Sequence, residues 1–368
     1  MIRDQAVRNG QAVVTTIDRR SVLKAVGGLG ALASSVGISS LVRASQLGLL
    51  DPSRVATFPL PEVQTAIIDD GAGKVTFTRD GPSNGSLVLY FHGWGDDYRG
   101  VMPLECGLAD AGFRVLLPHR PGYQGTTLDG TSRGKKQSWE GPSATADLFA
   151  KLLDTLYGSG KWNVAVVSMS GGTPSALAFA SRYSSQTRAV VLQGGVTQPF
   201  SEPKYVPEPF RQQYEVAFNK FGWAGDELSK VLFALLVKLR ETFLSDEDVI
   251  EALTGERLSG AKQDAAFNAV SAKMLFDDGT NRSGEWSYVR HTFFTKSPYC
   301  EWESLSVPTL LVHDEKDPFV PIVHAEEAMK RLRRATLQRF TLGGHMIWVG
   351  RDAKRMHEVR VEFLRQHS

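Results

Sequence analysis

The chain has 368 residues, of which 42% are apolar and 22% charged, so it is long and apolar enough to bury the core of one large or two modest globular domains. Its 42 basic and 40 acidic residues leave a formal net charge of +2, which argues against nucleic acid or an anionic membrane as a partner. There is no internal repeat or low-complexity block, which excludes a solenoid.

The N-terminal segment differs in kind from the rest of the chain. Arg19 and Arg20 precede an uncharged run over residues 25–42 that is rich in Gly, Ser and Ala. This pattern resembles a twin-arginine export signal, an address read by the export machinery. We therefore expect residues 1–44 to be a signal and residues 45–62 a linker, with the protein exported to the periplasm or beyond. An uncleaved membrane anchor and a cytoplasmic chain are the other interpretations.

Only two cysteines are present, Cys106 and Cys300, and they lie far apart in the sequence. An exported protein meets an oxidising compartment, so a disulfide between them is one interpretation. Burial of both as small apolar side chains is the other.

Apolar patterning predicts the secondary structure of the remaining chain. Alternation on either side of a glycine-rich turn predicts two antiparallel strands between residues 63 and 79. Near-continuous apolar runs predict strands buried on both faces at residues 86–91, 113–117, 164–167, 189–192 and 309–312. Helices are expected at about residues 101–111 and 143–157. This alternation predicts an α/β fold with a mostly parallel open sheet, helices on both faces, and ligands at the carboxyl ends of the strands.

The alternation is interrupted between residues 197 and 306, where strand-like runs are absent and helical ones are present. Leucine and valine residues at helical spacing form an apolar stripe over residues 228–239, which suits packing against the sheet. We therefore expect a core made of residues 63–196 and 307–368, with residues 197–306 as an inserted helical cap.

Three polar residues follow separate predicted strands in the order Ser170, Asp317, His345. These strands lie at residues 164–167, 309–312 and 337–342. A serine hydroxyl is a weak nucleophile until an imidazole accepts its proton, and a carboxylate then fixes the imidazole tautomer. Loops that follow parallel strands meet at one edge of the sheet. These residues are therefore candidates for the nucleophile, acid and base of a catalytic triad.

Several segments together resemble the α/β-hydrolase fold family. They are the HGWG run at 92–95, the RPGYQG run at 120–125, the serine and following helix at 170–183, the acid loop at 307–321 and the histidine loop at 343–345. The resemblance implies that Trp94 and Gly171 donate their amides to an oxyanion hole. It also implies that His92 and Gly93 form a supporting loop.

The chain departs from that pattern at two positions. Ser168 stands where the glycine before the nucleophile is usual, and Asp314 stands where a glycine usually follows the strand. Asp314 is the second candidate for the acid, although the spacing to the following proline favours Asp317.

The remaining histidines indicate no metal site. His119, His291 and His324 lack zinc-ligand spacing to cysteines or carboxylates, and no glycine-rich phosphate loop is present. The sequence therefore predicts an enzyme without a cofactor or metal.

The predicted activity is serine hydrolysis of a small-molecule carboxylic ester, or of an amide or thioester, through an acyl-enzyme. The resemblance leaves two alternatives open: a cofactor-free haloperoxidase or perhydrolase, and a hydrolase-like binding protein without turnover. Because fold does not fix specificity, the substrate depends on the cap.

Overall fold

The computed structural model describes most of the predicted core. Its described residues are 62–68, 73–93, 107–132, 135–200, 202–206, 288, 291–292, 295, 297–317, 319–341, 344–345, 347 and 352–368. The predicted export signal, residues 45–61 of the predicted linker, Cys106, Trp94 and the apolar stripe of the predicted cap lie outside these residues, so the expectations about them stay predictions.

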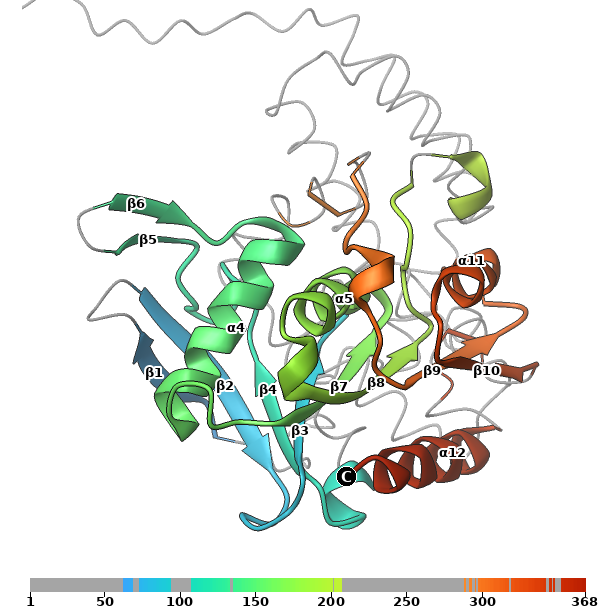
Figure 1. Ribbon diagram of the computed structural model, residues 1–368, viewed down its shortest axis with the longest axis horizontal. Coiled ribbons are helices and arrows are strands. Elements are labelled where there is room, and N and C mark those ends of the chain that lie inside the picture. Colours follow the sequence, from blue (N-terminus) through green and yellow to red (C-terminus); the bar gives the residue numbers. More distant parts are fainter. Residues whose placement is uncertain are drawn as a thin grey trace, which may run out of the picture. The chain divides into compact units, whose positions relative to one another are not determined.

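The core is one open sheet of eight strands in the order β1-β2-β4-β3-β7-β8-β9-β10 (Figure 1). The strands are β1 (Gln64–Ile68), β2 (Gly73–Asp80), β3 (Leu87–Phe91), β4 (Arg114–Pro118), β7 (Val164–Met169), β8 (Thr187–Gln193), β9 (Thr309–Asp314) and β10 (Ala335–Phe340). β1 and β2 pair antiparallel with each other, and β2 pairs antiparallel with β4. The other neighbours pair in parallel, which confirms the mostly parallel open sheet.

Helices cover both faces of the sheet. The elements outside the sheet include α4 (Gly141–Tyr157), α5 (Thr173–Arg182), α11 (Val323–Arg331), α12 (Ala353–Gln366) and the short turns η3 (Ser170–Gly172), η4 (Ser184–Gln186), η5 (Pro203–Tyr205) and η7 (Trp302–Ser304). On one face, Phe91 of β3 packs against Phe149 of α4 and Phe179 of α5, with ring centroids 5.2 and 5.7 Å apart.

On the opposite face, the Arg360 guanidinium of α12 donates to the Gln193 amide oxygen of β8 at 2.8 Å. The Gln193 amide in turn donates to the Tyr90 hydroxyl of β3 at 3.4 Å. Alternate residues of β3 thus face opposite helix layers, which explains why its sequence is apolar throughout.

Helix α4 begins two residues earlier than predicted, because Pro142 suits the first turn of a helix. It ends before Gly158, whose φ of +92° stops the helix. Of the helix expected around residues 101–111, residues 107–111 are described, and residues 107–110 of these are helical.

A two-stranded antiparallel hairpin of β5 (Asp129–Ser132) and β6 (Lys135–Ser138) was not predicted. Its strands are short and polar and lack the apolar alternation that predicts a strand.

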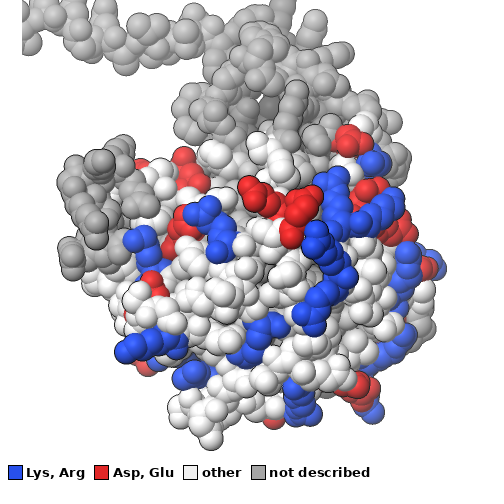
Figure 2. Space-filling view, in the orientation of Figure 1, with Lys and Arg blue, Asp and Glu red and all other residues white. Residues whose placement is uncertain are grey.

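Acidic and basic side chains are interspersed on the face shown in Figure 2. Arg339 pairs with Glu315 and Glu326, and Lys330 pairs with Glu327. No helix in the described part of the chain is long and apolar enough to span a membrane.

Cys300 is a buried free thiol, and burial raises its pKa to about 12. It is therefore neutral at physiological pH, as a small apolar side chain would be.

Candidate active site

Ser170 lies at a sharp turn between β7 and α5. Every residue of β7 is buried, and Met169 still has extended backbone angles. At Ser170, φ becomes +47°, in the left-handed region that L-residues with side chains rarely adopt. Among the described non-glycine residues, only Ser170 and Gln124 have a positive φ. Strained backbone of this kind is typical of functional positions because the surrounding structure must impose it.

The turn packs tightly against the end of β3. A Cβ atom at Gly172 would lie 2.3 Å from the Phe91 carbonyl oxygen and 2.5 Å from that of His92. Only glycine therefore permits this approach. The following helix α5 accommodates Pro174 in its first turn and directs its N-terminus toward the Ser170 turn.

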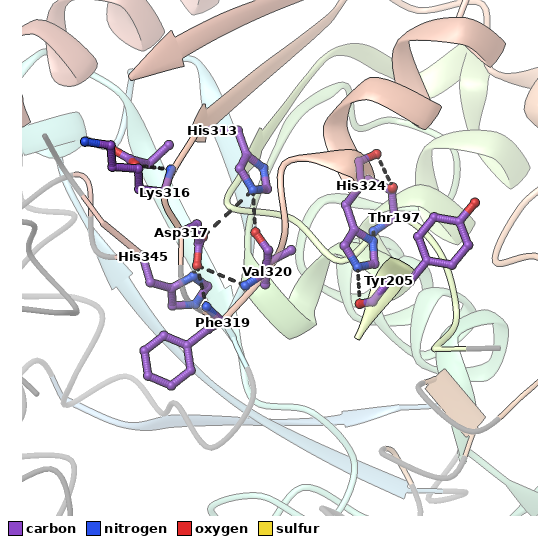
Figure 3. A network of polar contacts seen from close by, with 10 residues as sticks. Thr197, Tyr205, His313, Lys316, Asp317, Phe319, Val320, His324 and His345 are labelled. Carbon is purple, nitrogen blue, oxygen red and sulfur yellow. Dashed lines mark hydrogen bonds and ion pairs between the residues drawn. The ribbon is translucent and has the colours of Figure 1, made fainter. Parts of the chain in front are cut away.

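The two other triad candidates are hydrogen-bonded to each other. His345 Nδ1 lies 2.7 Å from Asp317 Oδ2 (Figure 3). The other oxygen of Asp317 accepts the backbone amides of Phe319 and Val320 at 2.8 and 2.9 Å. The carboxylate is thus fixed by its own loop. Since Nδ1 of His345 donates to it, Nε2 is the atom left with a lone pair.

The competing acid candidate, Asp314, has a different local role. Its Oδ1 accepts the backbone amide of Lys316 at 2.8 Å, which shapes the turn that follows β9. Of the two aspartates, it is Asp317 that is hydrogen-bonded to His345.

A second histidine reaches the Asp317 carboxylate. His313 Nε2 donates to the Val320 carbonyl at 2.7 Å and lies 3.9 Å from Asp317 Oδ2 (Figure 3). Burial lowers the pKa of His313, against the opposing effect of the Asp317 charge. His313 therefore supports the acid loop as a neutral donor.

The ionisation of Asp317 follows from these neighbours. Burial acts to raise its pKa, but the electrostatic attraction and hydrogen bond of His345 outweigh burial, together with the electrostatic effect of the His313 ring and the amide of Val320. The pKa of Asp317 therefore lies below its ordinary value, and the side chain is a carboxylate at neutral pH.

The segment after β8 contacts both the serine turn and the acid–base pair. The backbone amide of Val196 donates to the Ser170 carbonyl at 3.1 Å. A Cβ at Gly194 would lie 3.3 Å from Asp317 Oδ2 and 3.4 Å from His345 Nδ1. Because β7, β8, β9 and β10 are adjacent parallel strands, the three candidates follow their carboxyl ends at one edge of the sheet.

The predicted supporting loop is held by the segment after β4. His92 Nε2 accepts the backbone amide of Arg120 at 3.1 Å, and the Arg120 side chain donates to the His92 carbonyl at 3.1 Å. Since Nε2 is an acceptor, Nδ1 carries the proton, and it lies 3.2 Å from the Gly93 carbonyl. Gly171, the second predicted amide donor, is buried in the Ser170 turn.

His324 forms a separate buried network near the acid loop (Figure 3). Its Nδ1 accepts the backbone amides of Thr197 and Gln198, both at 3.3 Å, and its Nε2 donates to the Tyr205 carbonyl at 2.9 Å. Burial lowers the pKa of His324 to about 3 despite the opposing hydrogen bond to Tyr205. This neutral ring therefore links helix α11, which contains His324, to the segment that follows β8.

Sequence reasoning missed the supporting roles of His313, His324 and Gly194. The histidines carry no spacing signal because their partners are backbone atoms of other segments. In the described residues, no three His, Cys, Asp or Glu side chains are grouped as metal ligands would be.

Curated relatives match this chain in sequence, and solved structures match it in fold. The chain is 24% identical over 310 residues to the uncharacterized hydrolase YcgS of Bacillus subtilis strain 168, covering 82% of this chain and 98% of the relative. It is 26% identical over 324 residues to a 2-hydroxy-6-oxononadienedioate/2-hydroxy-6-oxononatrienedioate hydrolase of Burkholderia vietnamiensis strain G4, covering 82% and 94%.

Two solved structures illustrate the shared fold. An alpha/beta hydrolase fold protein from Nakamurella multipartita has a TM-score of 0.59 and 23% identity, covering 83% of this chain and 99% of that one. A bromoperoxidase from Bacillus anthracis has a TM-score of 0.57 and 19% identity, covering 83% and 100%. At these identities the likeness concerns the fold. Residues 86–350 match the alpha/beta hydrolase fold family. The chain is therefore a member of the alpha/beta hydrolase fold family.

Proposed function

We propose that this protein is a serine hydrolase that cleaves a small-molecule carboxylic ester through an acyl-enzyme intermediate. One observation carries the proposal: the 2.7 Å bond between His345 and Asp317 lies at the sheet edge that also holds Ser170, a serine with a φ of +47°. A strained serine and an oriented imidazole are the two parts that nucleophilic acyl transfer requires.

In the proposed acylation step, the Ser170 hydroxyl oxygen attacks the ester carbonyl carbon while His345 Nε2 accepts its proton. Asp317 keeps the proton on Nδ1 and stabilises the imidazolium that forms. The amides of Trp94 and Gly171 would receive the developing negative charge on the carbonyl oxygen, an interaction worth on the order of 3 kcal/mol per donor. His345 then gives its proton to the departing alcohol oxygen.

Deacylation repeats the chemistry with water as the nucleophile. His345 accepts a proton from water, the hydroxide attacks the acyl carbon, and the proton returns to Ser170 as the carboxylic acid leaves. No cofactor is needed for either step.

A second candidate is hydrolysis of a 2-hydroxy-6-oxo unsaturated dicarboxylate. It is favoured by the likeness to the Burkholderia vietnamiensis protein, whose name describes a hydrolase of 2-hydroxy-6-oxononadienedioate and 2-hydroxy-6-oxononatrienedioate. The sequence likeness extends along most of both chains, so a substrate of this class belongs in any activity screen.

The test is an activity screen of the full chain on 4-nitrophenyl esters of graded acyl length, together with a 2-hydroxy-6-oxo dienoate. Ser170→Ala should lower kcat by more than about 10³-fold and abolish labelling by a fluorophosphonate. Ser184→Ala, in the short turn η4, is the matched control and should retain both.

Undiminished ester turnover by Ser170→Ala would overturn the proposal. Turnover of the dienoate with no ester cleavage would favour the second candidate. Oxidation of a halide only when peroxide and a carboxylic acid are added would favour a perhydrolase. Stoichiometric labelling without turnover of any substrate would favour a binding protein.

A further inference from the structure

A buried tyrosine from the predicted cap contacts the serine turn. The Tyr288 hydroxyl donates to the Gly171 carbonyl at 2.8 Å and lies 3.0 Å from the Ser175 hydroxyl. Since the tyrosine proton is directed to the carbonyl, Ser175 donates to the tyrosine oxygen. Tyr288 is 3% exposed, so water does not replace these bonds readily.

The ring of Tyr288 also covers a buried cation. The guanidinium carbon of Arg120 lies 4.1 Å from the ring centroid of Tyr288, and Arg120 is 1% exposed. A desolvated guanidinium over an aromatic face is a favourable contact. The planar guanidinium therefore fixes where the ring of Tyr288 lies.

Arg120 holds the other predicted amide-bearing loop. Its side chain donates to the His92 carbonyl at 3.1 Å, and its backbone amide fixes the tautomer of His92. His92 Nδ1 then lies 3.2 Å from the Gly93 carbonyl. Arg120 thus reaches the Gly93 carbonyl through His92, and that carbonyl precedes the residue predicted to donate one amide of the oxyanion hole.

The pair thus joins two loops through their carbonyl groups. Tyr288 holds Gly171, Arg120 holds the segment at residues 92–93, and the two side chains contact each other. Burial raises the pKa of Tyr288, against the opposing charge of Arg120, so the hydroxyl keeps the proton that it donates.

We infer that Tyr288 and Arg120 are positioning residues that fix the serine turn, through the Gly171 carbonyl, relative to the loop at residues 92–93. These are the two segments predicted to carry the amides of the oxyanion hole. The inference rests on the proposed serine hydrolase function and extends it, because it makes the geometry of the hole depend on a residue of the predicted cap. Loss of the Tyr288 hydroxyl should weaken transition-state stabilisation and leave substrate binding nearly unchanged.

The chain offers a closely matched control. The Tyr299 hydroxyl donates to the Thr292 carbonyl at 2.7 Å, and the Thr292 hydroxyl donates to the Tyr288 carbonyl at 2.7 Å. Tyr288→Phe and Tyr299→Phe therefore each remove one buried hydroxyl-to-carbonyl bond from the same segment, and Tyr288→Phe also removes the contact with the Ser175 hydroxyl. Only the first of these bonds reaches the serine turn.

The experiment measures kcat and KM on 4-nitrophenyl acetate, the rate of fluorophosphonate labelling and the melting temperature for the full chain and both variants. We expect Tyr288→Phe to lower kcat and the labelling rate by about tenfold or more, with KM within about twofold. Tyr299→Phe should lose a similar amount of stability and keep kcat within about twofold.

Equal kcat values for the two variants, with the unaltered chain still labelled, would overturn the inference and leave the proposed function standing. Failure of the unaltered chain to react with the fluorophosphonate would overturn both. If Tyr288→Phe does not fold, Arg120→Lys decides in its place, since lysine keeps the charge but lacks the planar fork. A kcat within about twofold of the unaltered chain in that variant would overturn the inference.

Discussion

The Ser168 hydroxyl, near the end of β7, lies 3.0 Å from the Thr173 hydroxyl at the start of α5. Both side chains are fully buried, so each hydroxyl provides the hydrogen-bond partner that the other needs within the core. The serine that replaces the usual glycine is therefore accommodated by a partner five residues later, on the other side of the Ser170 turn.

Replacing this pair in a double-mutant cycle should give clear non-additivity. Ser168→Ala and Thr173→Val each leave the remaining buried hydroxyl without its hydrogen-bond partner. The expected cost of each is about 1–2 kcal/mol of unfolding free energy. The double variant should cost less than the sum by about 1 kcal/mol, measured by urea denaturation. Strict additivity would contradict a direct bond between the two hydroxyls.

Gly172→Ala should damage both stability and activity. The added methyl group would lie 2.3 Å from the Phe91 carbonyl oxygen, so the turn must move. We expect a loss of about 2–3 kcal/mol in unfolding free energy and at least a tenfold loss of kcat, because small displacements of a nucleophile are costly.

Gly73→Ala is the control for this prediction, because a Cβ there meets its nearest atom at an ordinary 3.6 Å. It should cost less than about 1 kcal/mol and leave kcat unaffected. Wild-type kcat in Gly172→Ala would show that the turn does not position the nucleophile.

Asp317→Asn tests the choice between the two aspartates. The amide cannot stabilise the imidazolium of His345 and favours the wrong tautomer, so kcat should fall by about 10³–10⁴-fold. Asp314→Asn changes a residue three positions away, and its loss of kcat should be at least about 100-fold smaller than that of Asp317→Asn. Steady-state kinetics on the best ester decide the matter, and equal losses would assign no special role to Asp317.

His324 should make the fold sensitive to acid. Its pKa is about 3 in the folded chain, well below the ordinary value of 6.5, so the unfolded chain binds the extra proton between these pH values. Stability attributable to His324 is therefore complete above about pH 6.5 and declines as the pH falls toward 3, by up to about 1.4 kcal/mol per pH unit.

His324→Gln removes this titration. Its unfolding free energy should be lower than that of the unaltered chain at neutral pH but should fall less steeply between about pH 6 and pH 4. Denaturation curves at a series of pH values measure the slope, and identical slopes would contradict the buried neutral histidine.

The sequence predicted the main strands because their burial on both faces leaves a strong apolar signal. Residues 86–91 and 164–167 differ from the observed β3 and β7 by at most two residues at either end. The hairpin of β5 and β6 was missed because polar strands depend on partner pairing, which local patterning does not record.

The pairing of Asp317 with His345 could be anticipated from the order of the predicted strands together with the spacing of Asp317 to the following proline. Tyr288, Arg120 and His313 could not be placed in the same way, because their contacts join segments far apart in the chain. A buried polar side chain shows its role only when its partner is known.

The lack of room for a side chain at Gly194 matters when natural relatives are compared. Its φ of +50° disfavours most side chains, and a Cβ there would stand beside both members of the acid–base pair. A homologue that keeps all three polar residues but carries a bulky residue at this position would need a rearranged acid–histidine loop. Position 194 is therefore a sequence marker by which inactive or repurposed descendants could be recognised.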